Sequence, residues 1–64
     1  MRSRVHQLGA LGRSQLVARY LELHPAAPIH AQQAAAQYWS AERLISLILG
    51  AEERQAATAG ERGR

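Results

Sequence analysis

Histidine, glutamate and serine are the residue types in this chain that could support chemistry. The 64 residues include three histidines, five acidic residues, all glutamate, and no cysteine. A zinc site needs three or four ligands with short local spacing. His24 and His30 flank a proline-rich turn, and His6 lies far from both in the sequence. We therefore expect no metal site, and the lack of cysteine excludes disulfides and thiolate ligands.

The glutamates and serines also have structural explanations. They fall on predicted helix surfaces, at predicted helix starts or in the C-terminal tail. A general acid or base needs a cleft that shifts its pKa, and no part of the sequence predicts one. We expect a protein that is not an enzyme and binds no cofactor.

The positive charge is concentrated in the terminal arms. The net charge is +3 and the isoelectric point is about 10.7. All eight basic residues are arginine, whereas residues 13–54 carry four arginines against four glutamates. Ordered nucleic-acid binders usually concentrate charge on one face. The abundant alanine and the absence of lysine are typical of a GC-rich bacterial, phage or plasmid gene.

Apolar runs in the chain are too short for a membrane span, which needs about 18 consecutive apolar residues. The basic N-terminus is not followed by a hydrophobic run, so we expect no signal peptide. The sequence therefore predicts a cytoplasmic protein that does not contact a membrane.

Three helices are predicted, over residues 13–24, 28–38 and 40–56. Ser14 or Gly12 can begin the first, and Pro25 ends it because the residue before a proline disfavours helical geometry. Pro28 suits the first position of the second helix, and Ser40 can cap the third. Residues 1–12 are predicted to be a basic flexible arm or frayed helix, because Gly9 and Gly12 weaken a helix there. Residues 57–64 are predicted to be a disordered tail.

The third predicted helix is unusually apolar. Its aliphatic residues spread over roughly 200°, against the roughly 100° stripe that a helix needs to face one core. A chain of this size buries only about 60% of the surface of its unfolded form, so small domains often need a partner. We expect an all-α domain, in which the first and third helices form a hairpin that the second bridges, completed by dimerisation. The predicted dimer seam consists of Leu44, Leu47, Ile48 and Ala51.

Tyr38 and Trp39 are adjacent and point about 100° apart on a helix, so one core cannot bury both. Aromatic residues and arginine are enriched in the energetic centres of protein interfaces. We therefore predict a small protein-binding module, an adaptor or inhibitor that docks on a larger protein. Its docking surface would combine Tyr38 or Trp39 with Arg19 and Arg43.

A DNA-binding regulator is the alternative. The segment lengths of residues 28–56 are similar to those of a helix-turn-helix motif. Aligning Ala35 with the small residue of the motif's first helix places Ala34, Tyr38, Ile45 and Ile48 inward. Glu42, Arg43 and Ser46 then point outward, where a recognition helix contacts bases, and the N-terminal arm would place Arg2 and Arg4 on phosphates.

Two features weaken this alternative. Trp39 and Ser40 stand where the motif prefers glycine and an aliphatic residue. The glutamates beside Arg43 and Arg54 repel phosphates. Docking on a protein is therefore the preferred prediction.

Overall fold

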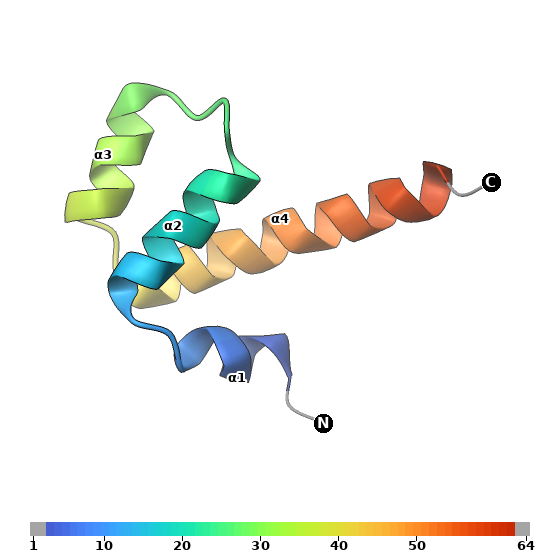
Figure 1. The fold of residues 1–64 in the computed structure, drawn as a ribbon, viewed down its shortest axis with the longest axis horizontal. Coiled ribbons are helices and arrows are strands. Elements are labelled where there is room, and N and C mark those ends of the chain that lie inside the picture. Colours follow the sequence, from blue (N-terminus) through green and yellow to red (C-terminus); the bar gives the residue numbers. More distant parts are fainter. Residues whose placement is uncertain (1–2, 63–64) are drawn as a thin grey trace.

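The computed structural model describes the backbone of residues 3–62 and the side chains of residues 3–58. Within that range the chain forms four helices: α1 (Arg4–Gly9), α2 (Arg13–Leu23), α3 (Ile29–Gln37) and α4 (Ala41–Arg62) (Figure 1). The described residues include no strand, so the predicted all-α class is confirmed, with four helices instead of three.

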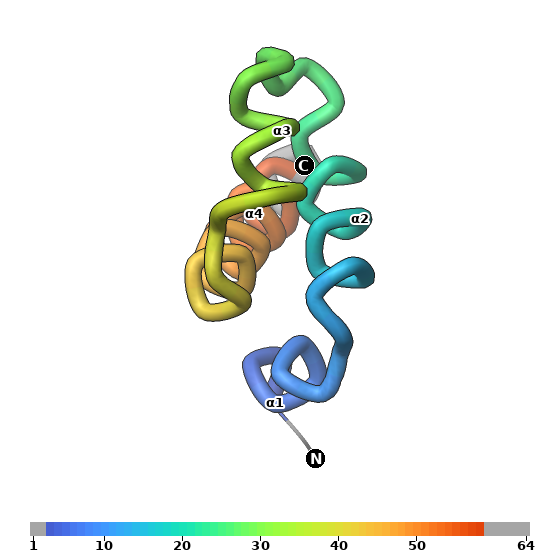
Figure 2. Tube along the Cα trace, turned by 90° about the vertical axis from the view of Figure 1, so that its left-hand side faces the viewer, coloured from blue at the N-terminus to red at the C-terminus, as the bar shows by residue number. Residues whose placement is uncertain are grey.

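α4 is the helix against which α1 and α2 pack. α2 packs most extensively against α4, α1 also packs on α4, and α3 packs on α2. Figure 2 shows α2 and α3 side by side and antiparallel. The predicted bridging helix therefore lies along α2, because the short turn containing Pro25 and Pro28 returns the chain beside the helix that it has just left. The second half of α4 runs past the other helices (Figure 1).

One apolar cluster forms the core. It combines residues from all four helices, and partly buried aliphatic side chains surround it. Burying a large aliphatic side chain stabilises the folded chain by about 1.5–3 kcal/mol. The fully buried large side chains are Leu8, Leu16, Leu44 and Ile48.

α1 is a capped helix within the segment for which a flexible arm or frayed helix is predicted. Ser3 caps it, since the Ser3 Oγ accepts a hydrogen bond from the His6 N–H at 3.3 Å. Leu8 is fully buried. Gly9 is the last helical residue, where its low helix propensity costs little. A short helix of this kind forms because it packs against α4, a contact that local propensity does not reveal.

Most predicted helix boundaries agree with the structure to within a residue. Gly12 caps α2, and the Gln15 Oε1 accepts a hydrogen bond from its N–H at 2.9 Å. His24 ends α2 before Pro25, and Pro28 is the N-cap of α3. Ser40 caps α4, because its Oγ accepts a hydrogen bond from the Arg43 N–H at 3.2 Å.

The end of α4 differs from the prediction. The helix continues to Arg62, whereas the predicted helix ended at residue 56 and a disordered tail followed. Residues 56–59 are three alanines and one threonine, and alanine is the best helix former. Residues 63 and 64 lie outside the described part of the chain.

The predicted dimer seam faces the interior of the single chain. Leu44 and Ile48 are fully buried and Ala51 is nearly so, while Leu47 is half-buried against the core. These side chains are covered because α1 and α2 both pack on α4. If residues 1–12 were a loose arm, as the sequence predicts, a second copy would have to cover this surface. Leu44, Ile48 and Ala51 are therefore core residues of the single chain, Leu47 packs against the core, and dimerisation stays a prediction.

Candidate functional site

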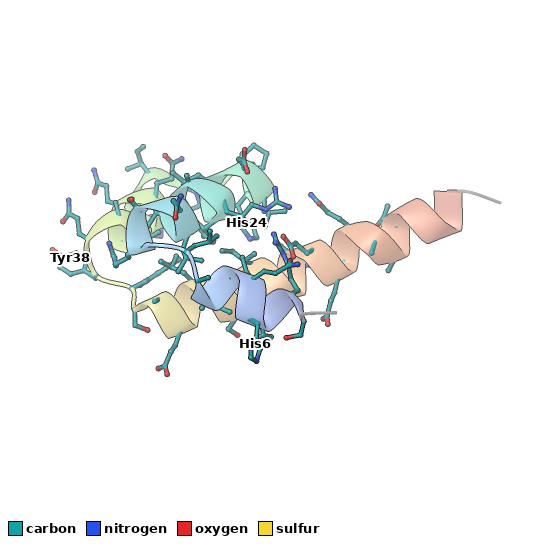
Figure 3. All side chains as sticks on the ribbon, turned by 60° about the horizontal axis from the view of Figure 1, so that its bottom comes forward. His6, His24 and Tyr38 are labelled. Atoms are coloured by element: carbon teal, nitrogen blue, oxygen red, sulfur yellow. The ribbon has the colours of Figure 1, made fainter. Side chains whose placement is uncertain are left out.

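The chain turns sharply between α3 and α4, and this turn presents the largest exposed aromatic side chain of the described residues. Tyr38 is the C-cap of α3 and is 79% exposed. Figure 3 shows Tyr38 at one extremity of the molecule, pointing away from the packed helices. We refer to Tyr38, Trp39 and Arg43 together as the α3–α4 corner.

Trp39 joins this corner to the core. Its ring meets the Tyr20 ring edge-on, with centroids 5.3 Å apart and planes 80° apart. The Arg43 guanidinium carbon lies 4.9 Å from the centroid of the Trp39 ring, within cation–π distance. The two adjacent aromatics thus differ in environment: Trp39 packs partly on the core, and Tyr38 faces solvent.

Arg13 holds the end of α3 from the first turn of α2. Its Nη1 donates a hydrogen bond to the Ala36 carbonyl at 2.7 Å, and its Nη2 donates to the Ala35 carbonyl at 2.8 Å. Its Nε and Nη2 both donate to the Trp39 carbonyl, at 3.0 and 2.8 Å. Sequence reasoning missed this residue. The sequence feature that indicates its role is the position of an arginine at a helix N-terminus, where the helix dipole disfavours positive charge.

Arg19 does not belong to the corner. Its guanidinium bonds Glu22 at 3.2 Å and Glu52 at 3.0 Å. Glu52 lies nine residues after Arg43 in α4, about 13 Å further along the helix. Of the predicted docking set, the structure therefore pairs Trp39 with Arg43, leaves the neighbouring Tyr38 exposed, and places Arg19 elsewhere.

Glu52 is the centre of an ion cluster that ties three helices together. Arg4 of α1 bonds its carboxylate at 2.6 and 2.9 Å, and Arg19 of α2 bonds it at 3.0 and 3.2 Å. Hydrogen bonding from Arg4 is the main cause that holds the pKa of Glu52 below its usual value of 4.5, against the opposing effect of burial. The cluster closes α1 and α2 over α4.

The residues predicted to contact DNA are divided by the structure. Glu42, Arg43 and Ser46 are exposed near the start of α4, but Arg4 is paired with Glu52. Arg2 lies outside the described residues. Tyr38, which the motif alignment placed inward, is exposed.

The histidines are dispersed. Figure 3 shows His6, on α1, at one edge of the molecule and His24, the C-cap of α2, well apart from it. Over the described residues, no three histidine, cysteine or acidic side chains are grouped so as to hold a metal ion. The His24 ring lies 4.6 Å from the Tyr20 ring, between centroids, and its Nε2 is buried without a hydrogen-bond partner.

None of the described helices has both the length and the apolar character to span a membrane. Comparison with known proteins gave no matching family model, no matching curated protein and no matching solved structure. The α3–α4 corner and its surroundings therefore provide the evidence on function.

Proposed function

We propose that this chain is a small non-enzymatic protein-binding module that docks on a larger protein through the α3–α4 corner. The observation that carries the proposal is the 79% exposure of Tyr38 beside the Trp39–Arg43 pair. Tyrosine, tryptophan and arginine are the residue types that dominate the energy of protein interfaces. A tyrosine in the centre of an interface can bury a large area and keep its hydroxyl hydrogen-bonded.

The proposal includes self-association or docking as the step that covers the exposed Tyr38 side chain.

The charges favour a protein over DNA as the partner. Arg4 and Arg19 are engaged with glutamate, and Arg13 is engaged with backbone carbonyls. Binding to DNA depends on arginine and lysine side chains that neutralise phosphates. Glu42, which is exposed beside Arg43, would repel DNA phosphates. A DNA-binding regulator is kept as an outcome that the following test can give.

The test is a tagged pull-down from a lysate of the source cells, with and without nuclease and at low and high salt. We expect a stoichiometric protein band that survives nuclease and salt, because a largely apolar contact is insensitive to both. Tyr38→Ala should lose the band. Gln33→Ala, an exposed change on the same helix, should keep it.

Two results would overturn the proposal. A band that both variants retain equally would place docking away from the corner. Recovery of DNA, with the protein bands lost on nuclease treatment, would assign the chain to the DNA-binding regulators.

A further inference from the structure

We infer that Arg13 is the positioning residue of the α3–α4 corner: its guanidinium fixes the path of the chain after α3 and thereby the outward placement of Tyr38. The hydrogen bonds run from the first residue of α2 to three carbonyls that lie 22 to 26 positions later in the sequence. They span the last turn of α3 and the residue after Tyr38.

α3 ends without a glycine cap. A helix leaves its last four carbonyls without partners inside the helix, and a residue in the left-handed region commonly helps to satisfy them. No residue of the described chain has such a positive φ, and Tyr38 itself has φ −121° and ψ −36°. The Ala34 carbonyl accepts from the Tyr38 and Trp39 N–H groups. Arg13 supplies the donors for Ala35 and Ala36.

The placement of Arg13 disfavours its own helix. A positive charge in the first turn of α2 meets the positive end of that helix dipole, whereas the end of α3 is negative. A residue that opposes its local element but satisfies a distant one indicates a role set by tertiary structure. The planar guanidinium can hold several carbonyls at fixed angles, which a lysine ammonium does not reproduce.

The consequence for binding rests on the proposed function. An anchor that is already held in its bound position loses less conformational entropy on association. Arg13 can lower this entropy loss without touching the partner, since its hydrogen bonds go to the backbone and leave the Tyr38 side chain exposed. It therefore acts through Tyr38 and Trp39.

The experiment is native-state amide hydrogen exchange on the full chain, followed by NMR. The reporters are the Tyr38 and Trp39 amides, which bond the Ala34 carbonyl at 2.7 and 3.0 Å. The reference is the amide of Ile48, within α4. Hydrogen bonds from charged donors are stronger than neutral ones, so Arg13→Gln should speed exchange of the reporters roughly tenfold or more relative to the reference.

The matched control is Arg19→Gln, which removes an arginine from the same helix at the ion cluster around Glu52. It should leave the ratio of reporter to reference rates unchanged. Arg13→Lys keeps the charge but loses the planar guanidinium, so it should raise the ratio of reporter to reference exchange rates by less than Arg13→Gln does. If Arg13→Gln does not fold, the ratio in Arg13→Lys tests the inference. An unchanged ratio in the folded Arg13 variants, or an equal rise in Arg19→Gln, would overturn the inference.

The two proposals fail separately. If the wild-type chain captures no protein, the docking function fails, and the exchange ratio still decides whether Arg13 positions the corner. If docking is confirmed, Arg13→Gln should weaken capture of the partner while Arg19→Gln does not. Equal capture by both variants would show that docking does not use the geometry that Arg13 fixes.

Discussion

Apolar burial joins α1, α2 and α4, whereas hydrogen bonds from a single arginine secure the end of α3. The first region contains the four fully buried aliphatic side chains, with Glu52 and its two arginines at the edge. α3 contributes one small buried residue, Ala35, and its C-terminal end is held by Arg13. The two regions thus depend on different physical effects.

This difference separates stability from positioning. Apolar burial is non-directional and roughly proportional to area, so it determines how firmly the helices associate. Hydrogen bonds to fixed carbonyls depend on distance and angle, so they determine where the chain runs. Changes in the first region should therefore alter the free energy of unfolding, and changes at Arg13 should mainly alter the local geometry of the α3–α4 corner.

The largest loss is expected in the centre of the first region. Ile48→Ala removes a fully buried side chain and should lower the free energy of unfolding by about 3–5 kcal/mol, enough to unfold much of a small domain. Urea titration followed by circular dichroism measures it. Ile29→Ala, at a residue that is 65% exposed, should change stability by less than about 0.5 kcal/mol. Equal losses would show that Ile48 is not in the core.

A smaller loss is expected at α1. Leu8→Ala removes the buried contact of this helix and should cost about 2–3 kcal/mol, because a short terminal helix can detach without opening the remaining core. Urea titration gives the loss, and Val5→Ala on the same helix serves as the exposed control. If Leu8→Ala behaves like Val5→Ala, residues 4–9 are the loose arm that the sequence predicted.

The ion cluster should add a pH-dependent contribution. The pKa of Glu52 is lowered in the folded chain, so at acidic pH the unfolded chain binds the extra proton. The stabilisation from Glu52 is therefore fully present above pH 4.5, and it is lost as the pH falls through the lower pKa that Glu52 has in the folded chain. Glu52→Gln should cost about 1 kcal/mol at neutral pH.

The pH dependence is measured as the difference between wild type and Glu52→Gln, since the other glutamates titrate in both. The difference should shrink as the pH is lowered from 6 to about 3. Glu53→Gln, an exposed neighbour on α4, is the control. A difference that is constant with pH would mean that the carboxylate is not stabilised by Arg4 and Arg19.

The smallest effect is a gain. Gly50 lies inside α4, and an added Cβ would meet the Arg54 Nη1 at 3.6 Å, an ordinary contact. Gly50→Ala should therefore raise stability by about 0.5–1 kcal/mol through helix propensity. Thermal unfolding measures the gain, with Ala57→Gly as the reverse change on the exposed part of the helix. Destabilisation by Gly50→Ala would reveal a close approach to Gly50 that the single chain does not show.

Features set by local chemistry could be predicted from the sequence. The prolines and Ser40 determine where α2 ends and α4 begins, and the spacing of Tyr38 and Trp39 predicts that they face different environments. These effects act over a few residues, so periodicity and capping rules capture them. The all-α class follows from the same signals.

Features set by distant contacts could not be predicted. α1 is stabilised by Leu8 in the core and by the Arg4–Glu52 pair, whose members are 48 positions apart. Arg13 bonds carbonyls of another helix. Because α1 was not counted as a covering element, the apolar surface around Leu44 and Ile48 was assigned to a second chain. The width of the apolar surface on a helix shows that other elements must cover it. Whether those elements belong to the same chain is known only from the fold.

The projecting half of α4 sets a fixed distance between the α3–α4 corner and the far part of the helix. From Ala41 the helix continues without interruption past Thr58, which is exposed and about 25 Å further along the axis. A dye attached at position 58 would therefore stand clear of the α3–α4 corner while remaining rigidly connected to it. Energy transfer from Trp39 to such a dye would report bending of α4 or movement of the corner, without a label on the surface that is proposed to bind.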